Sequence, residues 1–120
     1  MKSLKNTKTA ENLMKSFAGE SQARTRYTYY ANIARKQGYI QISNIFMETA
    51  EQEKEHAKRF YKFLRDDFKD EAIEITASYP ISLHEDTLSN LKAAATGENE
   101  EWTELYPTFA QVAREEGFQR

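Results

Sequence analysis

The chain has no cysteine, only four glycines and two prolines in 120 residues, and little net charge. The absence of cysteine excludes disulfides, zinc–thiolate sites, iron–sulfur clusters and cysteine nucleophiles within this chain. A net charge of −2 without a clear basic face argues against a nucleic-acid partner. No apolar run is long enough to span a membrane, and the start, MKSLKNTKTAENL, has no signal-peptide core. We therefore expect a cytoplasmic protein without a nucleic-acid or membrane partner.

The scarcity of glycine and proline leaves long stretches that are typical of helix. We predict three helices, at about residues 9–36, 41–65 and 87–115, with Gly38 and Gly117 as C-terminal stops. The polar connection between the second and third helices is long enough for a crossover rather than a tight hairpin. Seven Tyr, seven Phe and one Trp indicate a folded chain. We expect an all-α protein with one domain, residues 1–120.

Charged residues fall on the heptad-like apolar line of each predicted helix. They are Glu20 in the first helix, Glu53 and His56 in the second, and Glu98 and Glu101 in the third. For any one of these residues alone, the simplest explanation is that its position on the apolar line is assigned wrongly, since a repeat of 3.5 residues drifts against a helix of 3.6 residues per turn. Four glutamates and one histidine on three lines are harder to dismiss.

Inward carboxylates need a counter-charge, because burying one unpaired costs on the order of several kcal/mol. Apart from Arg24, for which the pattern gives no reason, no Lys or Arg lies on these lines. A metal centre is the natural counter-charge. Helix bundles hold two metal ions with one Glu from each of two helices and Glu-x-x-His from each of the other two.

The candidate ligands match most of this arrangement. Glu20 and Glu98 match the lone glutamates, Glu53 with His56 matches one Glu-x-x-His, and Glu101 is a possible extra ligand. Carboxylate-rich sites with a single imidazole favour iron or manganese over zinc or copper. We expect iron, two ions per complete site, with manganese or zinc as possible substitutes.

The third predicted helix repeats the first. Residues 12–20 match residues 90–98, and residues 31–39 match residues 110–118 with one extra residue between the two blocks. One extra residue inside a helix is typical of a π-bulge, and such bulges often mark functional sites. We expect the bulge near Glu101 and Pro107.

The same repeat predicts a copy of the second helix after Phe118, with its own Glu-x-x-His. The sequence stops at Arg120, so we expect the fourth helix of the bundle to be absent. The three helices would then carry an open apolar face that drives association.

Four motifs resemble those of rubrerythrins, in the order found in that family: FAGESQARTRY, QISNIFMETAEQEKEHAKRF, GENEEWTELYPTFA and AREEGF. The resemblance covers essentially the whole chain. It implies a ferritin-like four-helix bundle with a di-iron site that reduces hydrogen peroxide to water in oxidative-stress defence, as an NADH-linked peroxidase. Carried over by motif, the catalytic iron ligands would be Glu20, Glu53, His56, Glu98 and Glu101.

The resemblance also implies finer roles. Tyr27 and Tyr106 match family tyrosines that hydrogen-bond to ligand carboxylates, although ordinary core aromatics are an equal alternative. In that family, the residues that match Glu101 and His56 replace each other as a ligand of one iron ion when its redox state changes.

His84 lies outside the four motifs, and we expect it to be a loop or cap residue rather than a ligand.

Two departures from the family shape the expected partners. The cysteine-rich rubredoxin domain is missing, so electrons would come from a separate protein such as rubredoxin. The missing helix would be replaced in a homodimer or larger homo-oligomer by helices exchanged between chains, or by a second polypeptide. Alternatives are an inactive fragment or assembly subunit, and an iron-binding protein or ferroxidase.

Overall fold

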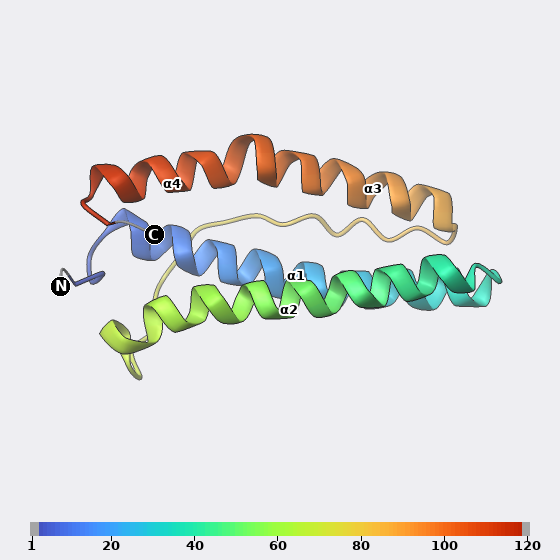
Figure 1. The fold of residues 1–120 in the computed structure, drawn as a ribbon, viewed down its shortest axis with the longest axis horizontal. Coiled ribbons are helices and arrows are strands. Elements are labelled where there is room, and N and C mark those ends of the chain that lie inside the picture. Colours follow the sequence, from blue (N-terminus) through green and yellow to red (C-terminus); the bar gives the residue numbers. More distant parts are fainter. Residues whose placement is uncertain (1–2, 119–120) are drawn as a thin grey trace.

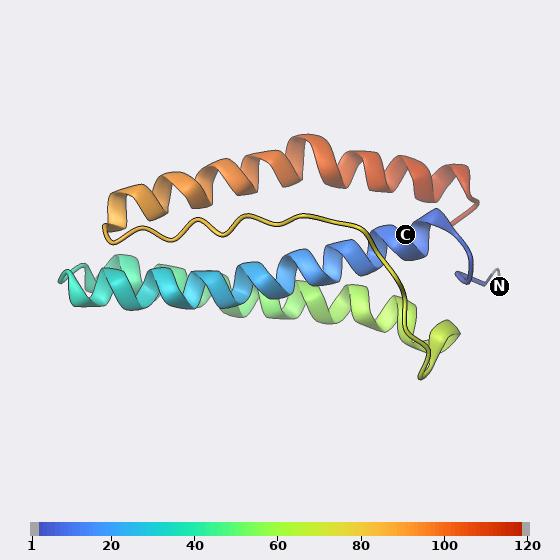
Figure 2. The same ribbon diagram turned by 180° about the vertical axis from the view of Figure 1, so that it is seen from behind.

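The computed structural model describes residues 3–118, and this range is all-helical, without a β-strand (Figures 1 and 2). Helix α1 spans Lys8–Lys36 and helix α2 spans Ile40–Phe68. A third rod consists of α3 (Thr87–Glu100), the π-helical segment η1 (Glu101–Leu105) and α4 (Tyr106–Glu115). The prediction of three helices is confirmed. None of the helices described is long and apolar enough to cross a membrane.

Glycine ends α1 as predicted. Gly38 has a φ of +88°, its N–H donates to the carbonyl of Arg35 at 3.0 Å, and Tyr39 N–H donates to Ala34 at 2.8 Å. This paired pattern satisfies carbonyls that the last helical turn leaves free, and it favours glycine because the left-handed backbone strains other residues. Gly117 ends α4 in the same way, also with a φ of +88°.

Helix α2 ends at Phe68 rather than at about residue 65. Its last turn is held by tertiary contacts, because Phe68 packs against the apolar cluster around Leu64 and the Asp67 carboxylate accepts from Leu4 N–H at 2.8 Å. Local sequence gives no sign of these contacts, since Leu4 lies far away along the chain.

The inserted residue of the repeat produces a π-helical segment. In η1 the N–H of Tyr106 donates to the carbonyl of Glu101, five positions earlier. The expected position of the bulge is therefore confirmed. Pro107 lies in the first turn of α4, where a missing N–H costs little.

Helix α1 is the centre of the fold. It packs along α2 on one side and against the third rod on the other, whereas the backbones of α2 and the third rod do not contact each other. The connection, residues 69–86, runs back along α1 in an extended form, so it is a crossover and not a hairpin (Figure 2). Tyr30 anchors it by donating to Ser82 O at 2.6 Å, and Tyr79 by donating to Lys15 O at 2.9 Å.

Two apolar clusters stabilise the ends of the α1–α2 pair. Tyr27, Tyr30, Ala31, Phe46 and Ala50 form one cluster, with Ile42 and Ala94 packed against it. Leu4, Ala10, Leu13 and Leu64 form the other, with five partly buried apolar neighbours. The middle of both helices lies between these clusters, and the inward polar residues occur there.

Candidate metal centre

The buried carboxylates lie midway along the α1–α2 pair. Glu20 of α1 is 3% exposed and Glu53 of α2 is 5% exposed, values normally reached by apolar side chains. The helical register that buries the flanking apolar clusters also turns these two carboxylates inward. The polar middle is therefore imposed by the packing at both ends.

Glu20, Glu53 and His56 form one group. Each offers a ligand atom, and these atoms all lie within 4.8 Å of one another. The Nδ1 atom of His56 is 3.7 Å from Oε2 of Glu20, which is too long for a hydrogen bond. The three-residue spacing of Glu53 and His56 brings both to the same face of α2. The structure thus brings together three of the five predicted ligands.

The Oε2 atom of Glu20 is the unusual feature of this group. It is buried, and the described residues provide no hydrogen-bond partner for it. Burial raises the pKa of Glu20 above its ordinary value, although the hydrogen bond from Tyr106 and the nearby His56 oppose the rise. A buried carboxylate oxygen without a donor is costly, and a bound cation would remove that cost.

Two tyrosines bridge α1 and the third rod. Tyr106 donates to Oε1 of Glu20 at 2.6 Å, and Tyr27 donates to Oε1 of Glu98 at 3.0 Å. Burial raises the pKa of both phenols, so both remain donors at neutral pH. The hydrogen bonds expected for these tyrosines are present, and they fix the rotamers of both carboxylates.

Glu98 and Glu101 are near Glu20 but are not among the three residues whose ligand atoms lie within 4.8 Å of one another. They come from the third rod, whose backbone reaches α1 but not α2. Burial, followed by the charges of Glu98 and Glu20, raises the pKa of Glu101 to about 7. The two carboxylates therefore contribute negative potential to the site without joining the three ligand atoms.

The structure explains Arg24, which the sequence pattern does not. The guanidinium lies 3.7 Å from the Glu51 carboxylate on the outer side of α2, and its side chain is 40% exposed. Arg24 therefore forms an ion pair between α1 and α2 and is not a counter-charge for the buried glutamates. His84 lies in the connection, where its backbone exchanges hydrogen bonds with the buried side chain of Asn90.

The repeat extends to contacts that the sequence analysis missed. The Glu116 carboxylate accepts from the N–H groups of Lys8 and Thr9 at the start of α1. The Gln37 side chain likewise accepts from Thr87 N–H at the start of α3. Thr9 and Thr87, like Gln37 and Glu116, hold matching positions of the repeat, so the alignment could have revealed these caps.

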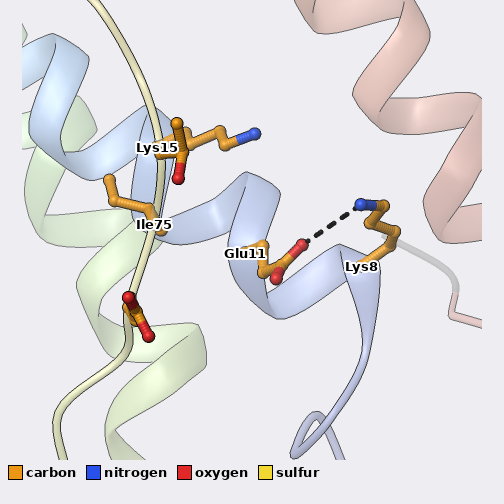
Figure 3. A pocket seen from close by; sticks show the side chains of 6 residues that line it. Lys8, Glu11, Lys15 and Ile75 are labelled. Carbon is orange, nitrogen blue, oxygen red and sulfur yellow. Dashed lines mark ion pairs between the residues drawn. The ribbon is translucent and has the colours of Figure 1, made fainter.

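The surface hollow in Figure 3 is separate from the metal candidates. It has a volume of about 320 Å³ and lies between α1 and the connection, where Lys8, Glu11, Lys15 and Ile75 are among its lining residues. The Lys8–Glu11 ion pair, 3.5 Å long, is exposed there. No member of the buried carboxylate group lines this hollow.

Comparison with known proteins identifies relatives along the whole chain. The family model of rubrerythrin matches residues 11–120. The chain is 73% identical over 118 residues to a rubrerythrin of Clostridium perfringens, covering 98% of this chain and 60% of that protein. It is 60% identical over 117 residues to a rubrerythrin of Porphyromonas gingivalis, covering 98% of this chain and 56% of that protein.

Solved structures of nigerythrin share the fold. A mixed-valence state gives a TM-score of 0.78 at 32% identity, covering 96% of this chain and 57% of that chain. The fully reduced, all-ferrous state gives a TM-score of 0.78 at 33% identity, covering 96% of this chain and 58% of that chain. The chain spans about 60% of the length of two curated clostridial rubrerythrins that it matches. From the family match and these identities, the chain belongs to the rubrerythrin family and has its ferritin-like helical fold.

Proposed function

We propose that this chain binds iron through Glu20, Glu53 and His56 and contributes to a di-iron peroxidase that reduces hydrogen peroxide to water. The observation that carries the proposal is the convergence of three ligand atoms within 4.8 Å between two apolar clusters. Family membership supports a di-iron protein of the rubrerythrin type. Peroxide as the substrate and a separate electron donor such as rubredoxin are parts of the proposal.

The residues present fit a divalent transition metal. Two carboxylates and one imidazole suit iron or manganese better than a soft metal. The buried Oε2 atom of Glu20 has no donor among the described residues and is close to His56, so a cation there would satisfy it. Ferrous iron occupies the fully reduced state of the structurally similar nigerythrin.

Reduction of one peroxide to two waters consumes two electrons and two protons, and two bound ferrous ions would supply the electrons. The chain's own residues would position the ligands and hold protons. Tyr106 fixes Glu20, and Tyr27 fixes Glu98, so neither carboxylate has to be reoriented when charge changes nearby. When Glu101 is not bound to metal, its pKa of about 7 lets its carboxyl group hold a proton beside the site at neutral pH.

A complete two-metal site requires a second Glu-x-x-His beyond the one at Glu53 and His56. We propose that association supplies it, either from a second copy of this chain or from another polypeptide. Apolar side chains on the helices support association, since Ile45 is 58% exposed and Leu105 is 48% exposed. Two copies of α1 and α2 would bring two lone glutamates and two Glu-x-x-His pairs together with two-fold symmetry.

A second candidate function is favoured by the group of ligand atoms within 4.8 Å, which contains only Glu20, Glu53 and His56 among the described residues. Such a site can take up one metal without peroxide chemistry, as an assembly subunit or an iron-binding protein with ferroxidase activity would. The two candidates differ in the preferred oxidant, because a peroxidase consumes peroxide faster than dioxygen when both are offered to the ferrous form.

The test compares Glu20→Gln with Glu51→Gln, a matched change on the exposed face of α2 where Glu51 pairs with Arg24. Iron content and peroxide consumption are measured after anaerobic loading, with a separate one-electron donor present. We expect Glu20→Gln to lose iron and turnover, and Glu51→Gln to keep both. Unchanged iron and turnover in Glu20→Gln would rule out the proposed site.

A further inference from the structure

We propose that Tyr106 and Trp102 form a path for single electrons between the Glu20 carboxylate and the protein surface. The use of the path rests on the proposed function, because the metal centre is its inner end. The path itself is a property of this chain's side chains. Neither the ligand set nor the comparisons assign a role to Trp102.

The path consists of two contacts in series. Trp102 in η1 is 64% exposed, and it is the only tryptophan of the chain. Its ring lies 5.5 Å from the ring of Tyr106, centre to centre, in an edge-to-face arrangement at 80°. The Tyr106 hydroxyl donates to Oε1 of Glu20 at 2.6 Å. Aromatic rings in contact and one short hydrogen bond therefore lead from solvent to the buried carboxylate.

The second tyrosine provides an internal comparison. Tyr27 makes the equivalent hydrogen bond to Glu98, but its ring neighbours are Tyr30 and Phe46 at 5.7 and 6.1 Å, both in the buried cluster. Its neighbours lead into the core and not to the surface. Both tyrosines thus contact another oxidisable ring, but the neighbour of Tyr27 is the buried Tyr30, whereas the neighbour of Tyr106 is the exposed Trp102.

The electron and proton changes balance without any net proton uptake. Tyr106 would give one electron to the oxidised, ferric form of the iron that Glu20 would hold, and its phenol proton to Oε1 of Glu20, which would leave a neutral tyrosyl radical. The Trp102 indole then gives one electron to that radical, and the proton returns from Glu20 to the phenol oxygen. An external one-electron donor reduces the Trp102 radical cation. The sum is one electron moved from the donor to the centre.

Such a path gives the donor a contact that leads to Glu20 without approaching the buried carboxylates. Glu20 and Glu53 are almost fully buried and the His56 side chain is 43% exposed, whereas the larger Trp102 ring is 64% exposed. Peroxide reduction needs two electrons per turnover, so a donor that carries one electron must deliver twice. A surface tryptophan allows both deliveries to be made at one exposed ring.

The first experiment needs no metal. Trp102 is oxidised in the metal-free full chain by a flash-generated ruthenium(III) polypyridyl complex, and the tryptophan and tyrosyl radicals are followed by transient absorption. We expect the tryptophan radical to decay as a tyrosyl radical grows. Tyr106→Phe should lengthen the tryptophan radical's lifetime several-fold, and Glu20→Gln, which leaves a poor proton acceptor, should do so to a smaller extent.

The control is Tyr61→Phe, the same chemical change on an exposed tyrosine whose ring contacts Phe17. Its tryptophan radical should decay as in the unmodified chain. Equal radical lifetimes in Tyr106→Phe and Tyr61→Phe would overturn the path. Circular dichroism verifies that each variant is folded, which is expected because Phe retains the ring.

The second experiment uses the iron-loaded chain. Trp102→Phe should bind as much iron as the unmodified chain, while its oxidised centre accepts electrons several-fold more slowly from a one-electron donor. Equal reduction rates would contradict the path even if the site exists. A chain that binds no iron would refute the proposed function alone, since the radical measurement is made without metal.

Discussion

The Tyr106 hydroxyl donates a hydrogen bond of 2.6 Å to Glu20, a residue 86 positions earlier in the chain. The repeat places Tyr27 and Glu98 at the matching positions, and they are joined by the same bond at 3.0 Å. Each half of the repeat therefore holds the carboxylate of the other half. This exchange ties α1 to the third rod at the level of the candidate metal centre.

The first prediction concerns these tyrosines. Tyr106→Phe removes the donor and leaves Oε1 of the buried Glu20 without its bond, so unfolding of the metal-free chain should become easier by about 1–3 kcal/mol. Iron affinity should fall by about 10–100-fold, since a carboxylate without its partner is no longer oriented. Urea denaturation and ferrous titration measure the two effects. Tyr61→Phe is the control and should leave both values unchanged.

The second prediction separates packing from metal binding. Phe46 is 4% exposed in the apolar cluster beside the site, so Phe46→Ala should cost about 3–5 kcal/mol of unfolding free energy. Leu88, on α3, is 63% exposed, and Leu88→Ala should stay within about 0.5 kcal/mol of the original chain. A small loss in Phe46→Ala, measured by urea denaturation, would mean that this cluster does not stabilise the fold.

The third prediction concerns pH. The pKa of Glu101 rises from 4.5 to about 7 on folding, so the folded state binds this proton more tightly than the unfolded state does. The stabilisation is complete below pH 4.5 and is lost as the pH rises through about 7. Thermal unfolding of the metal-free chain should therefore shift to lower temperature across this window.

Two comparisons identify the group responsible for the pH effect. Glu101→Gln should flatten the decline, whereas Glu104→Gln, an exposed position in the same π-helical segment, should not. Iron should also flatten it, because a bound cation compensates the carboxylate charges. An identical slope in Glu101→Gln and the unmodified chain would assign the titration to another group.

The fourth prediction concerns the cap that joins the end of the third rod to the start of α1. Glu116→Ala removes the acceptor for the Lys8 and Thr9 N–H groups, at a cost of about 0.5–2 kcal/mol. Amide hydrogen exchange should accelerate at these two residues. Glu115→Ala, at the exposed neighbouring position, should change neither the unfolding free energy nor the exchange rates of these two amides. Unchanged, slow exchange at Lys8 and Thr9 in Glu116→Ala would show that the cap is dispensable.

Local sequence was sufficient for the helices, and the internal repeat was sufficient for the π-helical segment. Gly38 and Gly117 mark helix ends because their left-handed backbone is rarely taken by other residues, and the inserted residue shows where the third rod must bulge. The inward line of α1 and α2 also predicted that Glu20, Glu53 and His56 would meet, and their ligand atoms do so.

The sequence could not predict the distances between α2 and the third rod. The inward lines do not show how close the backbones of α2 and the third rod come, and the role of Glu98 and Glu101 as ligands stays a prediction. The pairing of Arg24 with Glu51 and the last turn of α2 depend on contacts between distant segments. Helical periodicity reports which face is buried, but not what lies opposite it.

The most direct test of the iron site is native mass spectrometry of the chain after anaerobic loading with ferrous iron, because it reports assembly and iron content together. We predict a dimer or larger assembly with roughly one to two iron ions per chain. Glu20→Gln, loaded in parallel, should assemble with much less iron. Iron-free chains in every assembly state would contradict the account, since the buried carboxylates would then have no metal to hold.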